Sequence, residues 1–307
     1  MKRVERAAVK VWMVGSIGID DIMTRTAGRK NLMGGSLPFS TVASSFFAKT
    51  GAVGVVGSDF PISFDERWQS FGIDLQGVQR KEGPTFRWAC KYDDNMIERT
   101  TLMTELGVFA EFMPKLPASF MRAPFVLLGN IQPELQLHVL NQAVGPKFVA
   151  LDTMNLWIEI AKPALRKVIR RVDLLMLNDG EARMLTDKWN LCDCADVILK
   201  MGPRFVVIKK GEHGALLFSR KGIFIVPAYP VRKLIDPTGA GDSYAGAFMG
   251  YLAHVGRVTE GVMREALVCA SAVASFGVEG FSLDRFERLT AADITLRVKA
   301  LKRMMTN

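Results

Sequence analysis

The sequence is poor in the residues that bind transition metals. Its 307 residues include four cysteines and three histidines, and the histidines lie in separate segments. Cys192 and Cys194 are close, but no second cluster of cysteine or histidine completes the four ligands of a zinc site. The thiols are therefore expected to be reduced, as is usual in the cytoplasm.

Long hydrophobic runs are also missing. No run approaches the roughly 18 apolar residues that a membrane-spanning helix requires. Residues 1–6 are rich in basic side chains, but neither the apolar core nor the cleavage site of a secretory signal follows them. We expect a cytoplasmic protein with no membrane partner.

Two common nucleotide-binding motifs are absent. The chain has no Gly-x-x-x-x-Gly-Lys-[Ser/Thr] phosphate-binding loop. Gly15 and Gly18 do not complete the Gly-x-Gly-x-x-Gly spacing of dinucleotide-binding proteins. These absences disfavour a P-loop enzyme and a dehydrogenase of the Rossmann type.

Acidic residues are fewer than basic ones. The chain has 31 Asp and Glu residues and 40 Lys and Arg residues, which gives a formal net charge of +9. The basic residues are scattered, with local clusters in residues 166–171 and 299–303. Neither cluster carries the interleaved aromatic residues of a single-strand groove. We interpret them as solvated helix faces and predict no nucleic-acid partner.

Short apolar runs alternate with helical patterns along the chain. Continuously apolar runs are typical of parallel strands that are covered on both faces. The expected strands are 11–17, 52–57, 125–129, 148–151, 174–177 and 205–209. The expected helices are 37–49, 134–143, 163–171, 179–185, 240–254, 260–276 and 291–304. This alternation predicts an α/β fold with a mainly parallel sheet between helical layers.

One region departs from this alternation. Residues 85–92 alternate apolar and polar side chains, a turn-like Asp-Asp-Asn follows, and residues 96–103 continue the pattern. This predicts a β-hairpin, and residues 19–32 are expected to add strands beside it.

Residues 236–243, with the sequence Asp-Pro-Thr-Gly-Ala-Gly-Asp-Ser, are the most informative segment. A turn made of Gly239, Ala240 and Gly241 opens the helix expected from residue 240, and its amides could form an anion hole. The Asp242 carboxylate beside them could accept the proton of an attacking alcohol. In the simpler alternative, Asp242 only favours the helix start.

The segment resembles the C-terminal signature of the PfkB (ribokinase-like) family of carbohydrate and nucleoside kinases. Four other segments resemble motifs of that family and occur in the same order along the chain. They are residues 14–20, 34–36, 178–181 and 209–214. The resemblance covers roughly residues 11–290.

The resemblance implies a ribokinase-like three-layer α/β/α fold. A single domain would span residues 1–307, with a small β-sheet lid built from segments near 19–33 and 84–104. Because lid strands often pair between subunits in this family, the resemblance also implies a homodimer, although exposed strand edges can be blunted within one chain.

On the nucleotide side, the resemblance assigns Asn178 and Glu181 to phosphate and to Mg²⁺, which Glu181 would hold through water. The same pair also has the spacing of a helix capping box. The resemblance further implies nucleotide contacts from Lys209, Gly211 and Thr238. Asp236 would bind a monovalent cation such as K⁺, or simply cap its loop.

On the acceptor side, the resemblance selects Asp20 rather than its neighbour Asp21 for binding substrate hydroxyl groups. The backbone at Gly34 and Gly35 would pass close to the acceptor, and Ser36 would open a helix. Phe39 stands where many sugar-phosphorylating relatives have an asparagine. An aromatic ring cannot replace the amide hydrogen bonds but can stack against a flat surface.

We therefore expect an ATP-dependent kinase that transfers the γ-phosphate to a hydroxyl of a small sugar, with Asp242 as general base. A nucleoside kinase of the same family is the first alternative. A non-catalytic ligand-binding or regulatory protein with the same fold is the second. The presence of Asp242 and of both turn glycines favours an enzyme.

Overall fold

The computed structural model describes residues 8–306. Residues 1–6, on which the expected absence of a secretory signal partly depends, lie outside the described part.

A nine-stranded sheet has the order β13-β12-β11-β10-β9-β8-β1-β4-β5. Neighbouring strands from β11 through β10, β9, β8, β1 and β4 to β5 run parallel. Strand β12 is antiparallel to β11, and β13 is antiparallel to β12. The strands are β1 Val11–Val14, β4 Thr50–Gly57, β5 Asp74–Lys81, β8 Phe125–Leu128, β9 Phe148–Asp152, β10 Leu174–Asn178, β11 Phe205–Lys209, β12 Ala215–Ser219 and β13 Gly222–Val226.

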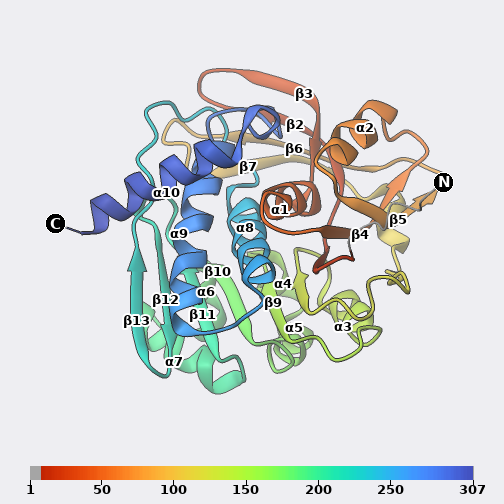
Figure 1. Ribbon diagram of the computed structural model, residues 1–307. Coiled ribbons are helices and arrows are strands. Elements are labelled where there is room, and N and C mark those ends of the chain that lie inside the picture. Colours follow the sequence, from red (N-terminus) through yellow and green to blue (C-terminus); the bar gives the residue numbers. More distant parts are fainter. Residues whose placement is uncertain (1–7, 307) are drawn as a thin grey trace, which may run out of the picture.

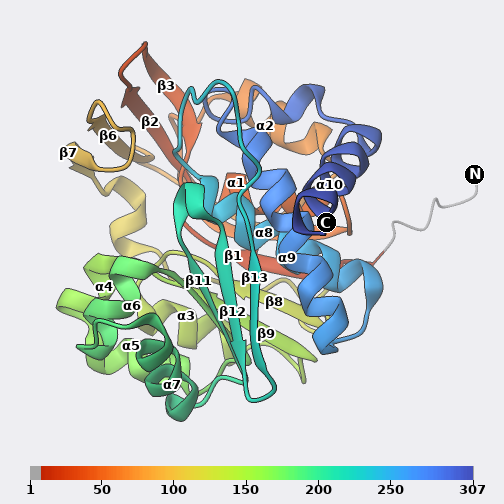
Figure 2. The ribbon, with the colours of Figure 1, turned by 90° about the vertical axis from the view of Figure 1, so that its left-hand side faces the viewer.

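Helices cover both faces of this sheet (Figures 1 and 2). One layer contains α1 Ser36–Ser45, α2 Ile62–Ser70, α8 Ala240–Val255, α9 Glu260–Gly277 and α10 Ala291–Met305. The other contains α3 Pro133–Leu140, α4 Asn155–Ile160, α5 Lys162–Ile169, α6 Asp179–Thr186 and α7 Leu191–Met201. Single turns of 3₁₀-helix lie at η1 Gly107–Glu111, η2 Gly211–His213 and η3 Phe286–Arg288.

The apolar strands separate two cores because successive side chains point to opposite faces of a sheet. In β1, Val11 and Met13 belong to the core beneath α1, α8 and α9. Trp12 and Val14 belong to the core beneath α3 to α7. The predicted three-layer α/β/α architecture is therefore confirmed.

A second, four-stranded sheet projects beyond the layers (Figure 2). Its order is β3-β2-β6-β7, with strands β2 Gly18–Met23, β3 Gly28–Gly34, β6 Phe86–Tyr92 and β7 Arg99–Glu105. The two outer pairs are antiparallel, and β2 and β6 are parallel. The two segments expected to pair do so, whereas closure as a lid and the single-domain organisation remain predictions.

Several elements were not predicted. The sequence gives no clear signal for β5, for the antiparallel strands β12 and β13, or for helices α2 and α7. The strands carry exposed positions at the sheet edge, as in β13, where Ile223 and Ile225 are more than half exposed. Their patterns are therefore less continuous than those of the central strands.

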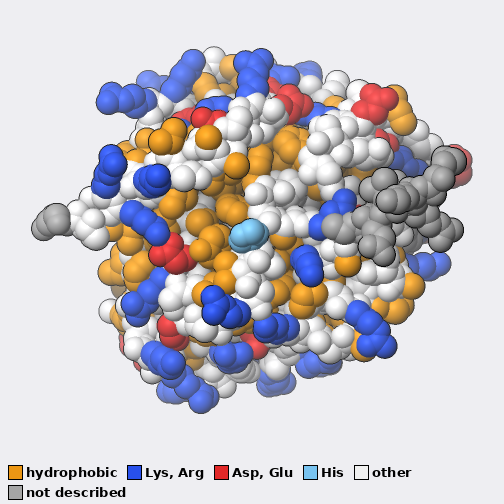
Figure 3. All heavy atoms as spheres, viewed as in Figure 1, with side chains coloured by type: hydrophobic (Ala, Val, Ile, Leu, Met, Phe, Trp, Pro, Cys, Tyr) orange, Lys and Arg blue, Asp and Glu red, His pale blue; other side chains and the backbone are white. Residues whose placement is uncertain are grey.

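Basic side chains are distributed over the face shown in Figure 3 and do not gather in one groove there. That distribution agrees with solvated helix faces, and the absence of a nucleic-acid partner stays a prediction. Among the described helices, none has the length and apolar character needed to cross a membrane.

Candidate active site

The first turn of α8 presents free backbone amides. Gly239 precedes the helix with a φ of 73°, in the left-handed region that favours glycine. The Ala240 N–H donates to the Pro237 carbonyl at 3.2 Å. Within residues 8–306, no backbone carbonyl accepts from the Gly239 or Gly241 N–H. Two of the three predicted anion-hole donors are therefore free, and the third is used to form the turn.

Asp242 lies in this first turn and is only partly buried. Burial raises the pKa of its carboxyl group to about 6, and the negative charge of Asp152 adds to the increase. The Lys209 charge opposes both effects. A carboxylate with this pKa is ionised at neutral pH and basic enough to accept a proton from an alcohol in the transition state.

Three strand ends meet beside α8. Asp152, Asn178 and Lys209 end the parallel strands β9, β10 and β11. Ligands bind to open α/β sheets beyond such carboxyl ends. Lys209 Nζ donates to both carboxylate oxygens of Asp152, at 2.8 and 3.0 Å.

Asp152 was not among the site residues predicted from the sequence. The signal was present, since an acidic residue directly follows the apolar run 148–151. A carboxylate at the end of a parallel strand deserves the same weight as Asn178 and Lys209, which end the neighbouring strands.

Asn178 and Glu181 form the capping box of α6. The Asn178 side chain accepts from the Glu181 N–H, and the Glu181 carboxylate accepts from the Asn178 N–H, both at 2.8 Å. Glu181 is nonetheless 8% exposed, and burial raises its pKa to about 7 although Lys209 acts against the increase. Its second carboxylate oxygen accepts no hydrogen bond from the described residues, so capping leaves one oxygen for a water or ion.

Asp236 is buried below the turn, and its carboxylate accepts the Thr238 N–H at 2.9 Å. It therefore caps its loop, as the simpler alternative expects. The Thr238 hydroxyl contacts the Tyr92 hydroxyl of β6 at 3.1 Å, which joins the small sheet to this loop.

Asp20 and Asp21 face opposite ways in β2, as alternation requires. Asp21 accepts the Asn31 N–H from the edge strand β3. Asp20 is 3% exposed, and its Oδ1 has no hydrogen-bond partner in the described structure. Burial raises the pKa of Asp20 to about 7, and the charges of Asp236 and Asp242 contribute to the increase.

The glycine pair provides close packing around Asp20. A Cβ at Gly34 would lie 1.9 Å from Asp20 Oδ2, and a Cβ at Gly35, where φ is 84°, would lie 2.5 Å from the Ser16 carbonyl oxygen. Ser36 begins α1, but its hydroxyl accepts the Ser16 N–H at 3.1 Å and is buried. Ser36 thus fixes the loop rather than offering a free hydroxyl.

Phe39 takes a different position from the one expected. Its side chain is 3% exposed, and a Cβ placed on Gly239 would lie 2.3 Å from its ring. The ring therefore supports the turn before α8 and does not present a face for stacking.

Trp88 of β6 provides the more accessible aromatic ring. It pairs in register with Asp20, so the two side chains lie on the same face of the small sheet. The indole is half-buried, and Arg99 of β7 lies over it at 5.5 Å. The Arg99 charge also lowers the pKa values of Asp242 and Glu181, although burial dominates both.

Gly211 is not joined to these residues by any described contact. It begins η2, is exposed, and has a φ of 54° with open space where a Cβ would lie. The described hydrogen bonds and charges thus bring together Asp20, Asp236, Asp242 and the strand-end residues but not Gly211.

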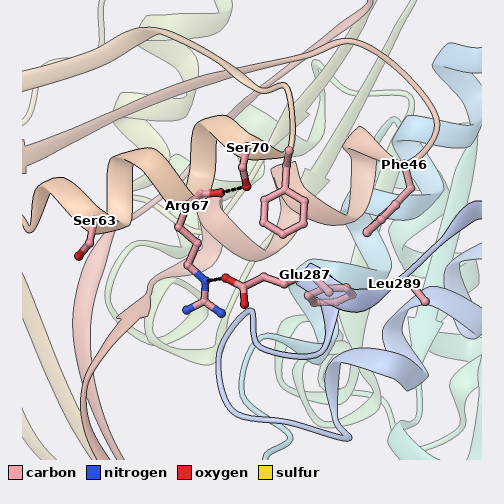
Figure 4. Close-up of a pocket in the computed structure, with 8 residues that line it drawn as sticks. Phe46, Ser63, Arg67, Ser70, Glu287 and Leu289 are labelled. Atoms are coloured by element: carbon pink, nitrogen blue, oxygen red, sulfur yellow. Dashed lines mark hydrogen bonds and ion pairs between the residues drawn. The ribbon is translucent and has the colours of Figure 1, made fainter.

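A hollow of about 550 Å³ lies elsewhere, between α2, the end of α1 and η3 (Figure 4). Its lining residues are Phe46, Ser63, Arg67, Ser70, Phe71, Phe286, Glu287 and Leu289. Arg67 and Glu287 form an ion pair there, so their charges neutralise each other. None of the predicted site residues lines this hollow.

Comparisons with known proteins agree with the geometry. The sequence pattern described as "pfkB family carbohydrate kinase" matches residues 20–285. The cytidine kinase of Thermococcus kodakarensis is 32% identical over 250 residues, which cover 78% of this chain and 87% of that protein. A nucleoside kinase of Methanothermobacter thermautotrophicus is 28% identical over 258 residues, 81% of this chain and 79% of the relative.

Solved structures show the same fold. The nucleoside kinase of Methanocaldococcus jannaschii, an archaeal member of the ribokinase family, superposes with a TM-score of 0.76 at 21% identity. The superposition covers 95% of this chain and 99% of that one. The chain belongs to the pfkB family of carbohydrate kinases, and it is a phosphotransferase with an alcohol group as acceptor.

Proposed function

We propose that this protein transfers the γ-phosphate of ATP to a hydroxyl group of a nucleoside. The observation that carries the proposal is the approach of Asp20, from the small sheet, to Asp242, at the start of α8. The Tyr92 hydroxyl of the small sheet contacts the Thr238 hydroxyl, four residues before Asp242, at 3.1 Å, and the charge of Asp242 also contributes to the raised pKa of Asp20. One is suited to hold an acceptor and the other to remove its proton.

Each group has one task in this proposal. Asp20 accepts hydrogen bonds from acceptor hydroxyls through its unpaired Oδ1. Asp242 takes the proton of the attacking hydroxyl, and the free amides of Gly239 and Gly241 hold the phosphoryl oxygens. Positioning and charge stabilisation are the main contributions that a protein makes to phosphoryl transfer.

A nucleoside fits better than the simple sugar that we first expected. The partly exposed indole of Trp88 lies beside Asp20, where it can stack on a base while the carboxylate holds the ribose. Both relatives compared above are named as kinases of nucleosides. We propose cytidine as the first acceptor to test, because the 32% identical relative is a cytidine kinase.

Mg²⁺ fits the free oxygen of Glu181, since this ion usually binds few carboxylates and keeps its waters beside phosphates. When bound, it neutralises charge on the phosphate oxygens. No cluster of three or more metal-binding side chains occurs among the described residues, so phosphates and water would complete its shell. The buried loop at Asp236 and Thr238 remains our candidate for K⁺.

We also propose a homodimer that forms through the small sheet, and a cytoplasmic location. Met23 and Leu102 are about half exposed on this sheet and line a shallow hollow with Ala89. A second copy could cover them. The four free thiols fit a reducing compartment.

The test is ADP release from Mg-ATP across a panel of nucleosides and sugars, with Asp242→Asn in parallel. Turnover with cytidine or another nucleoside that is lost in the variant supports the proposal. Turnover only with sugars would refute the nucleoside assignment and leave the kinase assignment intact.

The variant Trp88→Ala tests, within the site, whether the acceptor is a nucleoside whose base stacks on the indole. Losing a stacking surface should raise the KM for a nucleoside by about 10-fold, since such contacts contribute about 1–3 kcal/mol per base. The KM for MgATP should be unchanged. Equal KM values for the nucleoside in the two proteins would show that the indole does not contact the acceptor.

A further inference from the structure

The buried ion pair between Asp152 and Lys209 spans an entire strand. Asp152 pairs in register with Met176 of β10, and Lys209 pairs with Asn178 on the other side of that strand. Their side chains meet beyond its end, with exposed fractions of 7% and 16%. The long lysine side chain thus crosses over β10 to reach the carboxylate.

Stability alone does not explain such a pair. Removing two charges from water costs about as much as their attraction returns, and apolar replacements of buried pairs are often no less stable. The position of the pair is more informative. A Cβ on Gly241 would lie 3.2 Å from Lys209 Nζ, so the ammonium group lies against the first turn of α8.

The Lys209 ammonium group also has an N–H donor left for a further hydrogen bond. It carries three N–H donors, and its contacts within residues 8–306 are the two oxygens of Asp152. Its charge acts on Glu181 and Asp242 as well. The carboxylates of Asp152, Glu181 and Asp242 would repel a polyphosphate that binds beside them. A cation in contact with the phosphates offsets this repulsion, and the Lys209 ammonium group lies at the position where it can do so.

We propose that Lys209 contacts the phosphoryl group under transfer and that Asp152 is the positioning residue that holds the ammonium group there. This inference rests on the proposed function. In the step itself, the acceptor oxygen bonds to the γ-phosphorus as the bond from that phosphorus to the bridging oxygen breaks. ADP leaves with the electron pair, Asp242 takes the hydroxyl proton, and Lys209 keeps its own protons.

The kinetic test compares Lys209→Met, Asp152→Asn and the double variant. Lys209→Met should lower kcat by about 10²–10³-fold, as expected for one donor to a developing charge. Asp152→Asn should lower kcat by at least about 10-fold with little change in the acceptor KM. In the Lys209→Met background, Asp152→Asn should have less than about a 2-fold further effect, because residues that act as a unit are not additive.

The same rates should be measured at about pH 8.5, where Asp242 is ionised in every variant. This removes any effect that the lost lysine charge has on the base. Asp65→Asn serves as the matched control, since Asp65 is a buried carboxylate paired with Arg80 at 2.6 Å in α2 and β5. It should change the melting temperature but not kcat.

A binding measurement tests the inference without turnover. Lys209→Met and Asp152→Asn should each weaken binding of a non-hydrolysable ATP analogue, relative to ADP, by about 10-fold. The inference would be overturned, even in an active enzyme, if the kcat losses of the two single variants multiplied in the double variant. It would also be overturned if the ratio of the affinities for the ATP analogue and for ADP were unchanged in the variants. A wild-type protein inactive on the whole panel that keeps the affinity difference would refute the proposed function alone.

Two further outcomes are informative. A 10-fold higher Mg²⁺ requirement in Asp152→Asn, with none in Lys209→Met, would make Asp152 a metal ligand and overturn the positioning role. If Asp152→Asn does not fold, Asp152→Glu keeps the charge and displaces the ammonium group. It should reproduce the loss of kcat, and wild-type kcat in that variant would count against the inference.

Discussion

Asp242 can act as a base only when it is ionised, and this sets the pH dependence of the proposed reaction. Burial raises its pKa to about 6 in the free protein. We expect kcat/KM to fall as the pH drops below about 6, because protonation removes the base. Asp242→Asn should lose about 10²–10⁴-fold in kcat above about pH 7, where the base is ionised, and the difference from wild type should shrink at lower pH. A variant that retains more than a tenth of the wild-type rate would argue against this role.

Asp20 should make the folded protein less stable as the pH rises. Its pKa is raised from 3.8 to about 7, mainly by burial, so the native state binds its proton more tightly than the unfolded state does. Stability is therefore lost between about pH 4 and pH 7 and changes little above that range. Asp20→Asn removes this loss.

Urea unfolding of both proteins from pH 4 to pH 8 measures the effect. The stability of Asp20→Asn relative to wild type should increase over this range by at most about 4 kcal/mol. Glu181 titrates in both proteins and cancels in the difference, and Asp242 cancels apart from its interaction with the Asp20 charge. A constant difference across the range would mean that Asp20 is not perturbed.

At the scale of elements, the start of α8 depends on a glycine for two separate reasons. Gly239 has a φ of 73°, and a Cβ there would also meet the Phe39 ring at 2.3 Å. Gly211 has a similar φ of 54° but open space around it. The two positions therefore separate backbone strain from steric conflict.

Gly211→Ala should cost only the strain of about 1–2 kcal/mol in unfolding free energy. Gly239→Ala should cost more than Gly211→Ala and should also abolish turnover, since α1 or α8 must shift. Thermal unfolding and kcat of the two variants check this. Equal stability of the two variants, with normal kcat in Gly239→Ala, would contradict the proposed support from Phe39.

Elements with an uninterrupted local pattern could be predicted from the sequence. The central strands are apolar on both faces because helices cover both faces of the sheet. The glycine turn at Gly239 predicts the start of α8. The edge strand β13, with Ile223 and Ile225 exposed, lacks such a pattern. The sequence marks Asp152 as the end of an apolar run, but its ion pair with Lys209, 57 residues away in the sequence, is seen only in the fold.

At the scale of the whole molecule, the small sheet is the proposed contact between two copies. Its edge strands β3 and β7 have no further strand partner among the described residues, and Met23 and Leu102 are about half exposed. A lysine at either exposed position would place a charge that must be desolvated in a contact between two copies, which is costly without a partner of opposite charge. Met23→Lys with Leu102→Lys should therefore convert a dimer into a monomer.

Sedimentation velocity at several protein concentrations checks this prediction. Ile223→Lys, on the exposed edge strand β13 of the large sheet, is a matched control that should leave the dimer intact. A wild-type monomer at every concentration, or dissociation by the control alone, would exclude the small sheet as the interface.

The Asp20 carboxyl group, buried between the small sheet and the start of α8, also couples acceptor capture to the proton balance of the solution. With a pKa of about 7, it is only partly ionised in neutral buffer. Hydroxyl groups that donate to it favour the ionised form, so the acceptor should displace a proton as it binds. The heat of acceptor binding should then vary with the ionisation enthalpy of the buffer, and acidification below about pH 7 should weaken acceptor binding.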